Sequence, residues 1–503
     1  MRIPVDSPDP RLVVHFLNRA GFGPAPGQVR AVLAEGLPSY AGRQLEARAD
    51  PRLEERIRRR FGDQDYSVTE MHEIYRGTSP FARKDLPLHG TMAMLEHFYT
   101  AKMLRAVRSQ SQLHEVLVDF WFNHFNVSRV SARQTTIAYE RDAIRPNVTR
   151  SFGDLLAATA CHPAMLFYLD NYLNRKDTVV GGRLVRGLNE NYGRELLELH
   201  TVGVSAGYSQ QDVIDAARVF TGWTLDHPRG DLGQGSGAFV FRPEEHDNRP
   251  KRVLGLELPA GGGREEGERL LAYLSVHPAA ATFVSRKLAR RFVADDPPVS
   301  LVDRCARSFQ ATGGDLRKVM ATLLESPEFW AAPQEPRFKT PFEFVVSALR
   351  AVDAEIQSAT PALTDSLDAL GMRPFHCTPP TGFSDRGADW LSPTYLHRLN
   401  FALSLAAGRI AGVRVRVAEL VRSLGAEPED ASSIASAVNK EIFGGALSGA
   451  TVEAVTAPAL GLGVVDRLLG LLSPPRHGLQ AELGGLAPRV VGLLLASPEM
   501  QIR

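Results

Sequence analysis

Apolar residues recur at helical spacing along much of the chain. One stripe contains Leu113, Leu117, Phe120, His124 and Val127, which stand at i, i+4, i+7, i+11 and i+14. At about 100° per residue these positions fall on one face of a helix, so the pattern predicts a helix that is buried along that face. His124 is the only polar member of the stripe.

A second helical pattern follows Ser209. Its apolar positions are Val213, Ala216, Ala217 and Phe220. We expect Ser209 to cap this helix, with help from the carboxylate of Asp212 three residues later. The short, glycine-bounded segment 203–207 precedes it. A link of this length predicts an antiparallel hairpin with the helix before it.

The segment 226–258 follows a different pattern. Its glycine-rich part, 230–237, precedes the short apolar runs 238–241 and 252–256, which a polar turn separates. These features predict a small β-hairpin inserted between helical parts. The expected fold class is therefore mainly α: a multi-helix globular protein built from helical hairpins, with a small inserted β-hairpin. The expected parts are a helical part with a candidate polar site (1–225), the insertion (226–258) and a helical C-terminal part (259–503).

Composition narrows the classes of partner. The chain has 503 residues, of which 44% are apolar, so a substantial core is expected. Lys and Arg number 58 against 57 Asp and Glu, a formal charge of +1. This balance gives no overall positive electrostatic potential that would attract nucleic acid, so nucleic acid is not expected as a partner. The three cysteines are too few for a disulfide framework in a chain of this length.

The densest group of polar side chains lies on a predicted helix that starts at Glu190. Asn191, Glu195 and Glu198 share a narrow stripe at i, i+4 and i+7, whereas His200 falls on the opposite, apolar side. Two interpretations are open. The stripe is a solvent face on which Arg194 pairs with the glutamates. Alternatively, it is a paired-carboxylate site that acts as acid and base or holds a divalent metal ion.

Two histidines extend this candidate site. His124 is either a core residue with one satisfied nitrogen or a buried base beside Glu195 or Glu198. His246 and Asp247 follow the insertion and are either turn residues or part of the site, and we expect His246 to reach the acidic stripe. The candidate catalytic residues are His124, Glu195, Glu198, His246 and Asp247. The candidate metal ligands are Glu195, Glu198 and His246.

Several stretches are similar to motifs of one bacterial family. They include Phe120-Trp121-Phe122-Asn123-His124-Phe125, Asn189-Glu190-Asn191-Tyr192-Gly193-Arg194-Glu195, Pro163-Ala164-Met165, and Pro379-Pro380 with Gly382-Phe383. The chain resembles the family known as domain of unknown function 1800 across most of its length. This resemblance implies no settled activity for any residue.

The start of the chain lacks the apolar stretch of a secretory signal, and no segment approaches the roughly twenty apolar residues of a membrane span. These features predict a cytoplasmic location, or export if the true start lies upstream. Many relatives in the resembled family carry export signals. The resemblance therefore implies a polysaccharide or an envelope-derived substrate.

Two functions from different classes follow. One is a hydrolase with a carboxylate and histidine pocket, with or without help from a divalent metal ion. The other is a non-catalytic binding or assembly scaffold. The sequence contains no Gly-x-Ser-x-Gly elbow, His-Glu-x-x-His motif or dinucleotide fingerprint, which removes support for several standard enzyme classes.

Overall fold

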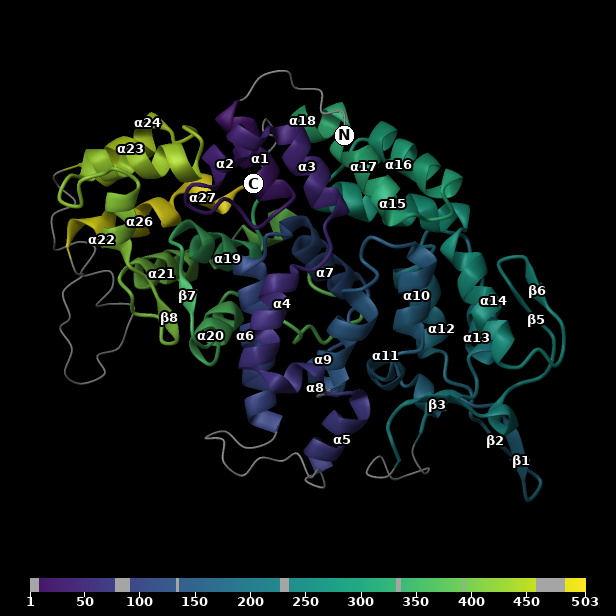
Figure 1. Cartoon of the computed structure of the whole chain (residues 1–503). Coiled ribbons are helices and arrows are strands. Elements are labelled where there is room, and N and C mark those ends of the chain that lie inside the picture. The colour runs from purple at the N-terminus through teal and green to yellow at the C-terminus, as the bar shows by residue number, and fades with distance from the viewer. Residues whose placement is uncertain are drawn as a thin grey trace.

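The structure is a computed structural model that describes residues 9–76, 91–132, 135–226, 235–331, 336–391, 394–457 and 485–503. Helices make up most of this part of the chain, and strands occur only in two-stranded antiparallel pairs, which confirms the mainly α fold class. Figure 1 shows α6 and α7 near the centre, with α10 to α14 on one side and the C-terminal helices α21 to α26 on the other. Among these residues no helix is both long and apolar enough to cross a membrane.

The helices up to residue 173 are α1 Pro10–Arg19, α2 Gln28–Glu35, α3 Leu37–Glu46, α4 Pro51–Arg60, η1 Gly62–Asp65, α5 Val68–Arg76, α6 Thr91–Arg108, α7 Gln112–His124, α8 Arg129–Ala132, α9 Thr135–Tyr139, η2 Glu140–Ile144, α10 Phe152–Ala160, α11 Pro163–Tyr168 and η3 Asn171–Leu173. The next group is α12 Asn191–Glu195, η4 Leu196–His200, α13 Gln210–Val219, η5 Pro243–Glu245, α14 Arg264–Ser275, α15 Pro278–Phe292, α16 Val299–Ala311, α17 Leu316–Leu324 and α18 Pro327–Ala331. The last group is α19 Pro341–Ala351, α20 Ala362–Ala369, η7 Gly387–Trp390, α21 Tyr395–Ala406, α22 Val417–Ser423, α23 Ala431–Ile442, α24 Gly449–Thr456, α26 Leu486–Ala496 and α27 Pro498–Gln501.

The strands are β1 Thr178–Val180, β2 Arg183–Val185, β3 Trp223–Leu225, β4 Phe239–Phe241, β5 Lys251–Val253, β6 Leu256–Leu258, β7 Glu355–Ile356 and β8 Val413–Arg414. They pair as β1 with β2, β3 with β4, β5 with β6, and β7 with β8.

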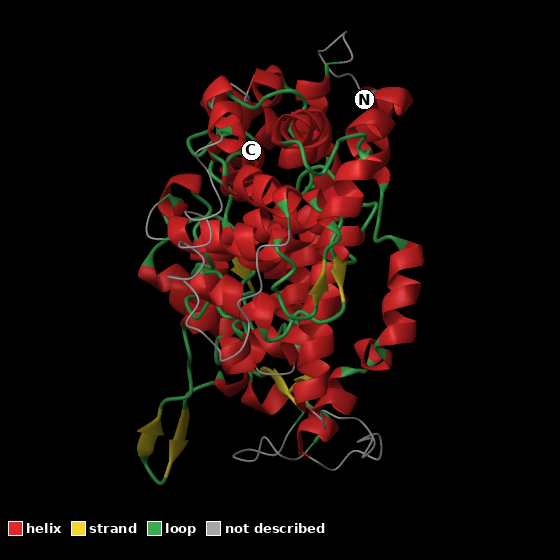
Figure 2. Ribbon diagram, turned by 90° about the vertical axis from the view of Figure 1, so that its left-hand side faces the viewer, coloured by secondary structure: helices red, strands yellow, loops and turns green. Residues whose placement is uncertain are grey.

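A single large apolar core extends from Val13 in α1 to Met500 in α27. It includes residues from all three parts into which the sequence pattern divides the chain, and that division itself stays a prediction. Figure 2 shows the helices packed closely together, with one strand pair projecting from them.

Helix α7 lies inside the core. The predicted stripe of Leu113, Leu117, Phe120, His124 and Val127 is buried at every position, which confirms the burial pattern. The helix ends at His124, so Val127 stands beyond its last turn. Most other residues of α7 are buried as well, because helices α3, α6 and η2 pack against it.

The predicted hairpin between residues 190 and 220 is present. Ser209 and Asp212 form a reciprocal capping box at the start of α13, as the sequence predicts. Gly193 in α12 packs against the backbone of α13: a Cβ there would lie 2.7 Å from the amide nitrogen of Ala217. Only a glycine allows the two helices to approach this closely.

The helix that starts at Asn191 is not regular. After Glu195 it continues as η4, a π-helical turn over Leu196–His200. The wider turn rotates the following side chains relative to a straight α-helix. Helical spacing from Glu190 also predicts that Leu196 and Leu199 are buried; Leu196 and Leu197 are buried, but Leu199 is only half-buried, so the prediction for Leu199 is wrong.

The insertion differs from its predicted pairing. The predicted apolar runs coincide with β4 and β5, but these two strands do not pair with each other. β4 pairs with β3, which lies before the insertion, and β5 pairs with β6 through a tight turn at Leu254 and Gly255. The segment 227–234, which includes much of the glycine-rich part, lies outside the described residues.

Candidate functional site

The three residues of the acidic stripe differ in exposure. Asn191 is exposed, whereas Glu195 and Glu198 are half-buried. Arg194 lies between the carboxylates of this surface. Its Nη2 is 3.0 Å from Glu190 Oε2, and its Nη1 is 3.4 Å from Glu198 Oε1. Two ion pairs therefore hold Arg194 beside Glu198, while Glu195 forms no ion pair with it.

The two glutamates are electrostatically coupled. Partial burial, and then the neighbouring Glu198 carboxylate, raise the pKa of Glu195 above its usual value, and Arg194 opposes this effect. Burial and a hydrogen bond to Glu198 raise the pKa of the Tyr208 phenol to about 12. Glu195 therefore holds a proton more readily than an isolated glutamate, and Tyr208 keeps its proton.

Tyr168, in α11, connects this acidic surface to the segment after Cys377. Burial raises the pKa of its phenol, and the charges of Cys377 and Glu195 raise it further, so the three groups lie within electrostatic range. The Tyr168 hydroxyl donates to the carbonyl oxygen of Thr378 at 2.7 Å. A neutral phenol is thus hydrogen-bonded to the backbone of that segment, within electrostatic range of Glu195.

Two asparagines at the end of α7 and just after it hold the same segment. Asn126 Nδ2 donates to the carbonyl oxygens of Cys377 at 3.0 Å and Pro379 at 2.8 Å. Asn123 Nδ2 donates to Phe383 O at 2.9 Å, and Phe383 N donates to Asn123 Oδ1 at 2.8 Å. The motif 120–125 and the Pro-Pro-x-Gly-Phe motif at 379–383 are therefore in direct contact.

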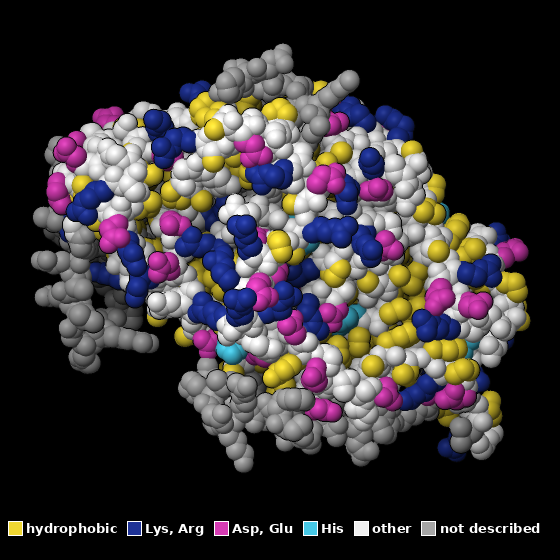
Figure 3. Space-filling view, in the orientation of Figure 1, with side chains coloured by type: hydrophobic (Ala, Val, Ile, Leu, Met, Phe, Trp, Pro, Cys, Tyr) yellow, Lys and Arg dark blue, Asp and Glu magenta, His cyan; other side chains and the backbone are white. Residues whose placement is uncertain are grey.

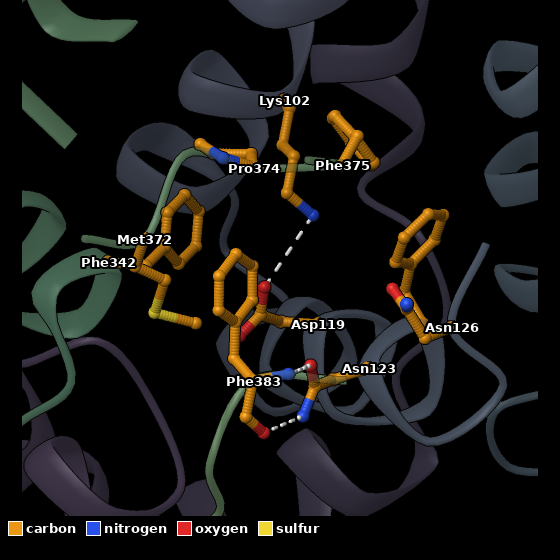
Figure 4. A pocket seen from close by; sticks show the side chains of 10 residues that line it. Lys102, Asp119, Asn123, Asn126, Phe342, Met372, Pro374, Phe375 and Phe383 are labelled. Carbon is orange, nitrogen blue, oxygen red and sulfur yellow. Dashed lines mark hydrogen bonds and ion pairs between the residues drawn. The ribbon is translucent and has the colours of Figure 1, made fainter. Parts of the chain in front are cut away.

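A cavity of about 30 Å³ lies between α6, α7 and residues 372–383 (Figure 4). This volume holds only a few water molecules. The cavity is lined by Lys102, Asp119, Phe122, Asn123, Asn126, Phe342, Met372, Pro374, Phe375 and Phe383.

Lys102 is the charged centre of this cavity. Its Nζ is 2.9 Å from Glu140 Oε2 and 3.6 Å from Asp119 Oδ1. Burial opposes the charge on Lys102, but the Glu140 and Asp119 carboxylates outweigh burial, and the pKa of Lys102 is raised. Three phenylalanine rings surround the ammonium, with Phe375 nearest at 4.9 Å from its centroid. Lys102 is therefore a compensated cation, and an ionised ammonium is a poor nucleophile or base.

His124 lies in the core, as expected for a core residue with one satisfied nitrogen. It is buried, and its Nε2 lies 3.0 Å from the carbonyl oxygen of His200. Its ring packs edge-on against Phe125 and Trp121, at centroid distances of 4.5 and 5.3 Å. Burial lowers the pKa of His124 well below its usual value. Because its partner is a backbone carbonyl rather than a carboxylate, the arrangement favours a packing role over a catalytic one.

His246 and Asp247 lie in a buried polar network of their own. His246 Nδ1 is 2.8 Å from Thr221 O, and its Nε2 is 3.3 Å from Glu266 Oε2. Asp247 accepts hydrogen bonds from Arg218 and Arg249, at 2.9 Å from Arg218 Nε and 3.0 Å from Arg249 Nε. These contacts differ from the prediction that His246 reaches the acidic stripe, because no hydrogen bond or ion pair between described residues joins His246 to Asn191, Glu195 or Glu198.

Helix α13 separates the two polar groups. Arg194 donates a hydrogen bond to Oε1 of Gln210, the first residue of α13. Arg218, eight residues after Gln210 in the same helix, donates a hydrogen bond to Asp247. At 1.5 Å per residue the two anchor points are roughly 12 Å apart along the helix. The His246 loop therefore docks near one end of α13, and Arg194 docks at the other.

The predicted metal ligands Glu195, Glu198 and His246 do not assemble. In the described parts of the chain, no group of three or more His, Cys, Asp or Glu side chains has a geometry that could hold a metal ion. The side chain of His246 is already engaged with Thr221 and Glu266, so it does not fit the proposed ligand set.

The sequence interpretation missed Lys102, Asn123, Asn126 and Tyr168. Asn123 lies within a motif that resembles the family, and this resemblance is the sequence feature that could have pointed to Asn123. Its partner Phe383 is 260 residues away, and nothing in the spacing of either motif indicates that the two meet.

The fold and the site define a mainly helical protein in which two motifs from distant parts of the chain are in direct contact, and in which a separate helix carries a pair of half-buried carboxylates. The chain belongs to the family described as Protein of unknown function (DUF1800), whose model matches residues 15–502. No curated protein and no solved structure matches the chain.

Proposed function

We propose that the protein is a hydrolase in which Glu195 is the general acid and Glu198 is the general base. The observation that carries this proposal is the position of two half-buried carboxylates three residues apart, with the pKa of Glu195 raised by burial and by Glu198. Two carboxylates with different environments are the usual acid and base of hydrolytic sites.

In this proposal Glu195 donates its proton to the leaving oxygen of the substrate. Glu198, next to Arg194, accepts a proton from the attacking water, whose oxygen forms the new bond as the scissile bond breaks. One product receives the hydroxyl group of the water, and the other receives the proton from Glu195. Transfer of a proton from Glu198 back to Glu195 then restores the starting protonation of both side chains. His124 and Asp247 have no role in this reaction, because both are held in other buried contacts.

The proposed substrate is a polysaccharide or another envelope-derived polymer. Paired carboxylates are the catalytic groups of most glycoside hydrolases. The phenols of Tyr168 and Tyr208, which lie near Glu195 and Glu198, support this class because aromatic rings and hydroxyl groups suit a sugar ring. A resident metal ion is not part of the proposal, since the three predicted ligands do not fit a shared ion.

The test is release of reducing ends from purified bacterial cell-wall polysaccharides by the full chain. Glu195→Gln and Glu198→Gln should each lower the rate at least about 100-fold, since general acid or base catalysis contributes about 10² to 10⁴. Glu190→Gln is the matched control, because Glu190 pairs with the same Arg194 but lies outside the proposed acid–base pair. The wild-type rate should fall as pH rises through the raised pKa of Glu195. Equal rates for all three variants would contradict the proposal.

A binding or assembly role is the second candidate, and the β1–β2 hairpin favours it. This hairpin presents exposed apolar side chains that the rest of the fold leaves uncovered. If the chain releases no reducing ends and both glutamate variants behave like the wild type, this second candidate replaces the hydrolase.

A further inference from the structure

The β1–β2 hairpin extends away from the body of the molecule, as Figures 1 and 2 show. Its strands pair Thr178 with Val185, Val179 with Leu184, and Val180 with Arg183, around a turn at Gly181 and Gly182. It forms a separate two-stranded sheet, and no further strand of the described residues pairs with either edge.

The hairpin exposes apolar side chains that the core does not use. Val179 and Leu184 are directly opposite each other on one face, and they are 69% and 61% exposed. Leu173, shortly before the hairpin, is 54% exposed. Apolar side chains gathered on a projecting element mark a binding surface more often than scattered ones do.

Cations flank these apolar residues. Arg183 and Arg186 are exposed, and no ion pair between described residues joins either of them to a carboxylate. Arg175 and Lys176 precede the first strand. The nearby Asp177 is engaged at the base of the hairpin, where it accepts hydrogen bonds from Gly187 N at 2.7 Å and Leu188 N at 3.3 Å. The projecting part therefore combines apolar side chains with an excess of positive charge.

This combination is local. Elsewhere on the face that Figure 3 shows, Lys and Arg side chains are interspersed with Asp and Glu. The formal charge of the whole chain is only +1, so the excess of cations at the hairpin does not reflect a generally basic protein.

We propose that the β1–β2 hairpin binds the surface of a lipid bilayer that contains anionic lipids. Val179 and Leu184 would enter the boundary between headgroups and acyl chains, and the flanking arginines would contact the lipid phosphates. This proposal does not depend on the hydrolase proposal, because the hairpin contains none of its catalytic groups.

Charge argues against a second copy of the chain as the occupant. A two-fold contact through this hairpin would place Arg183 and Arg186 of one copy against the same cations of the other. The apolar area of two side chains is also far smaller than the area that a stable dimer buries. An anionic bilayer avoids both problems, since it supplies negative charge and a large apolar interior.

The test is co-sedimentation of the full chain with phosphatidylcholine vesicles and with vesicles of phosphatidylcholine and phosphatidylglycerol. We expect binding to the anionic vesicles only. Arg183→Gln with Arg186→Gln should weaken it about 30-fold, from a contribution of about 1 kcal/mol for each cation near the surface. Val179→Ser with Leu184→Ser should weaken it at least about tenfold.

Matched variants control for exposure and charge. Val204→Ser with Val299→Ser changes two apolar residues that are each 69% exposed elsewhere on the surface. Arg59→Gln with Arg264→Gln removes the same charge from α4 and α14, where both arginines form ion pairs within their own helices. Both control pairs should bind vesicles like the wild type.

Three results would overturn the proposal. The first is no binding of the wild type to either vesicle. The second is equal losses from hairpin and control variants. The third is a concentration-dependent dimer in light scattering that Val179→Ser with Leu184→Ser abolishes, which would make a second copy the occupant. Unchanged melting temperatures for the hairpin variants would show that folding is intact.

Discussion

The side-chain amide of Asn123 forms hydrogen bonds with both backbone polar groups of Phe383. Its Nδ2 donates to the carbonyl oxygen at 2.9 Å, and its Oδ1 accepts from the amide nitrogen at 2.8 Å. One side chain from α7 thereby takes the place of a neighbouring strand for this residue. Because the two residues are 260 positions apart, this contact joins an early helix to the C-terminal part of the chain.

We predict that Asn123→Asp lowers the free energy of unfolding by about 1–3 kcal/mol, because it replaces the donor amino group with an oxygen that faces the Phe383 carbonyl. Chemical denaturation of both proteins measures the difference. Asn439→Asp is the control, since the Asn439 side chain uses its oxygen to accept from Leu447 N at 3.1 Å, and aspartate keeps that acceptor. Equal stabilities for Asn123→Asp and the wild type would show that the paired hydrogen bonds contribute little.

Gly382 is the residue that allows this contact. Its φ is +74°, and a Cβ there would lie 2.7 Å from Asn123 Oδ1 and closer still to the Asn123 carbonyl oxygen. We predict that Gly382→Ala destabilises the fold by more than Gly207→Ala. Gly207 has a similar φ of +78° but nothing within 4 Å of the corresponding Cβ. Gly207→Ala should cost about 1 kcal/mol from backbone strain alone. Similar losses in denaturation midpoint for the two variants would contradict the close approach.

Buried neutral histidines should make the fold sensitive to mild acid. Burial lowers the pKa of His15 and His200 to about 3, and that of His114 and His162 to about 4, from an ordinary 6.5. The unfolded chain therefore takes up protons at these residues as pH falls below 6.5, while the folded chain does not. Their contribution to stability is complete above pH 6.5 and is lost as pH falls toward the lowered pKa values.

We predict that the free energy of unfolding decreases between pH 6.5 and pH 5 by up to about 1.4 kcal/mol per pH unit for each such histidine. Chemical denaturation at a series of pH values measures this slope. A folded variant that lacks one of these histidines, such as His200→Gln, should show a weaker pH dependence of the free energy of unfolding. The decrease in slope should equal the contribution of one histidine. A flat profile over this range would show that these side chains are already accessible to protons in the folded state.

The sequence alone predicts the parts of this fold that depend on local spacing. The stripe through α7 is correct because burial on one face of a helix requires apolar residues at i, i+4 and i+7. The cap at Ser209 is correct because the hydroxyl and the Asp212 carboxylate act on backbone groups only three residues away. Both features are decided within a few turns of one helix.

Features that depend on distant partners could not be read from the pattern. The apolar run that forms β4 is correctly placed, but its partner β3 precedes the insertion, and strand spacing does not specify which strands pair. The π-helical turn at Leu196–His200 has no signature in the apolar period. The same limit applies to His246, whose position depends on the contact of Asp247 with Arg218 at 2.9 Å.

The pair of Lys251 and Glu266 is a close, buried ionic contact in the His246 network. Both side chains are almost fully buried, and Lys251 Nζ is 2.5 Å from Glu266 Oε2. The same oxygen is 3.3 Å from His246 Nε2. Burial opposes the negative charge on Glu266, but the hydrogen bonds from His246 and Lys251 outweigh burial and lower the pKa of Glu266.

We predict that Lys251→Met lowers the free energy of unfolding by about 3–5 kcal/mol, because it leaves the Glu266 carboxylate buried without its cation. The double variant Lys251→Met with Glu266→Gln should lose less than the sum of the two single losses, since it removes both charges together. Lys318→Met is the control, because Lys318 is exposed at the start of α17. Additive losses in a denaturation cycle would show that the two groups do not stabilise each other.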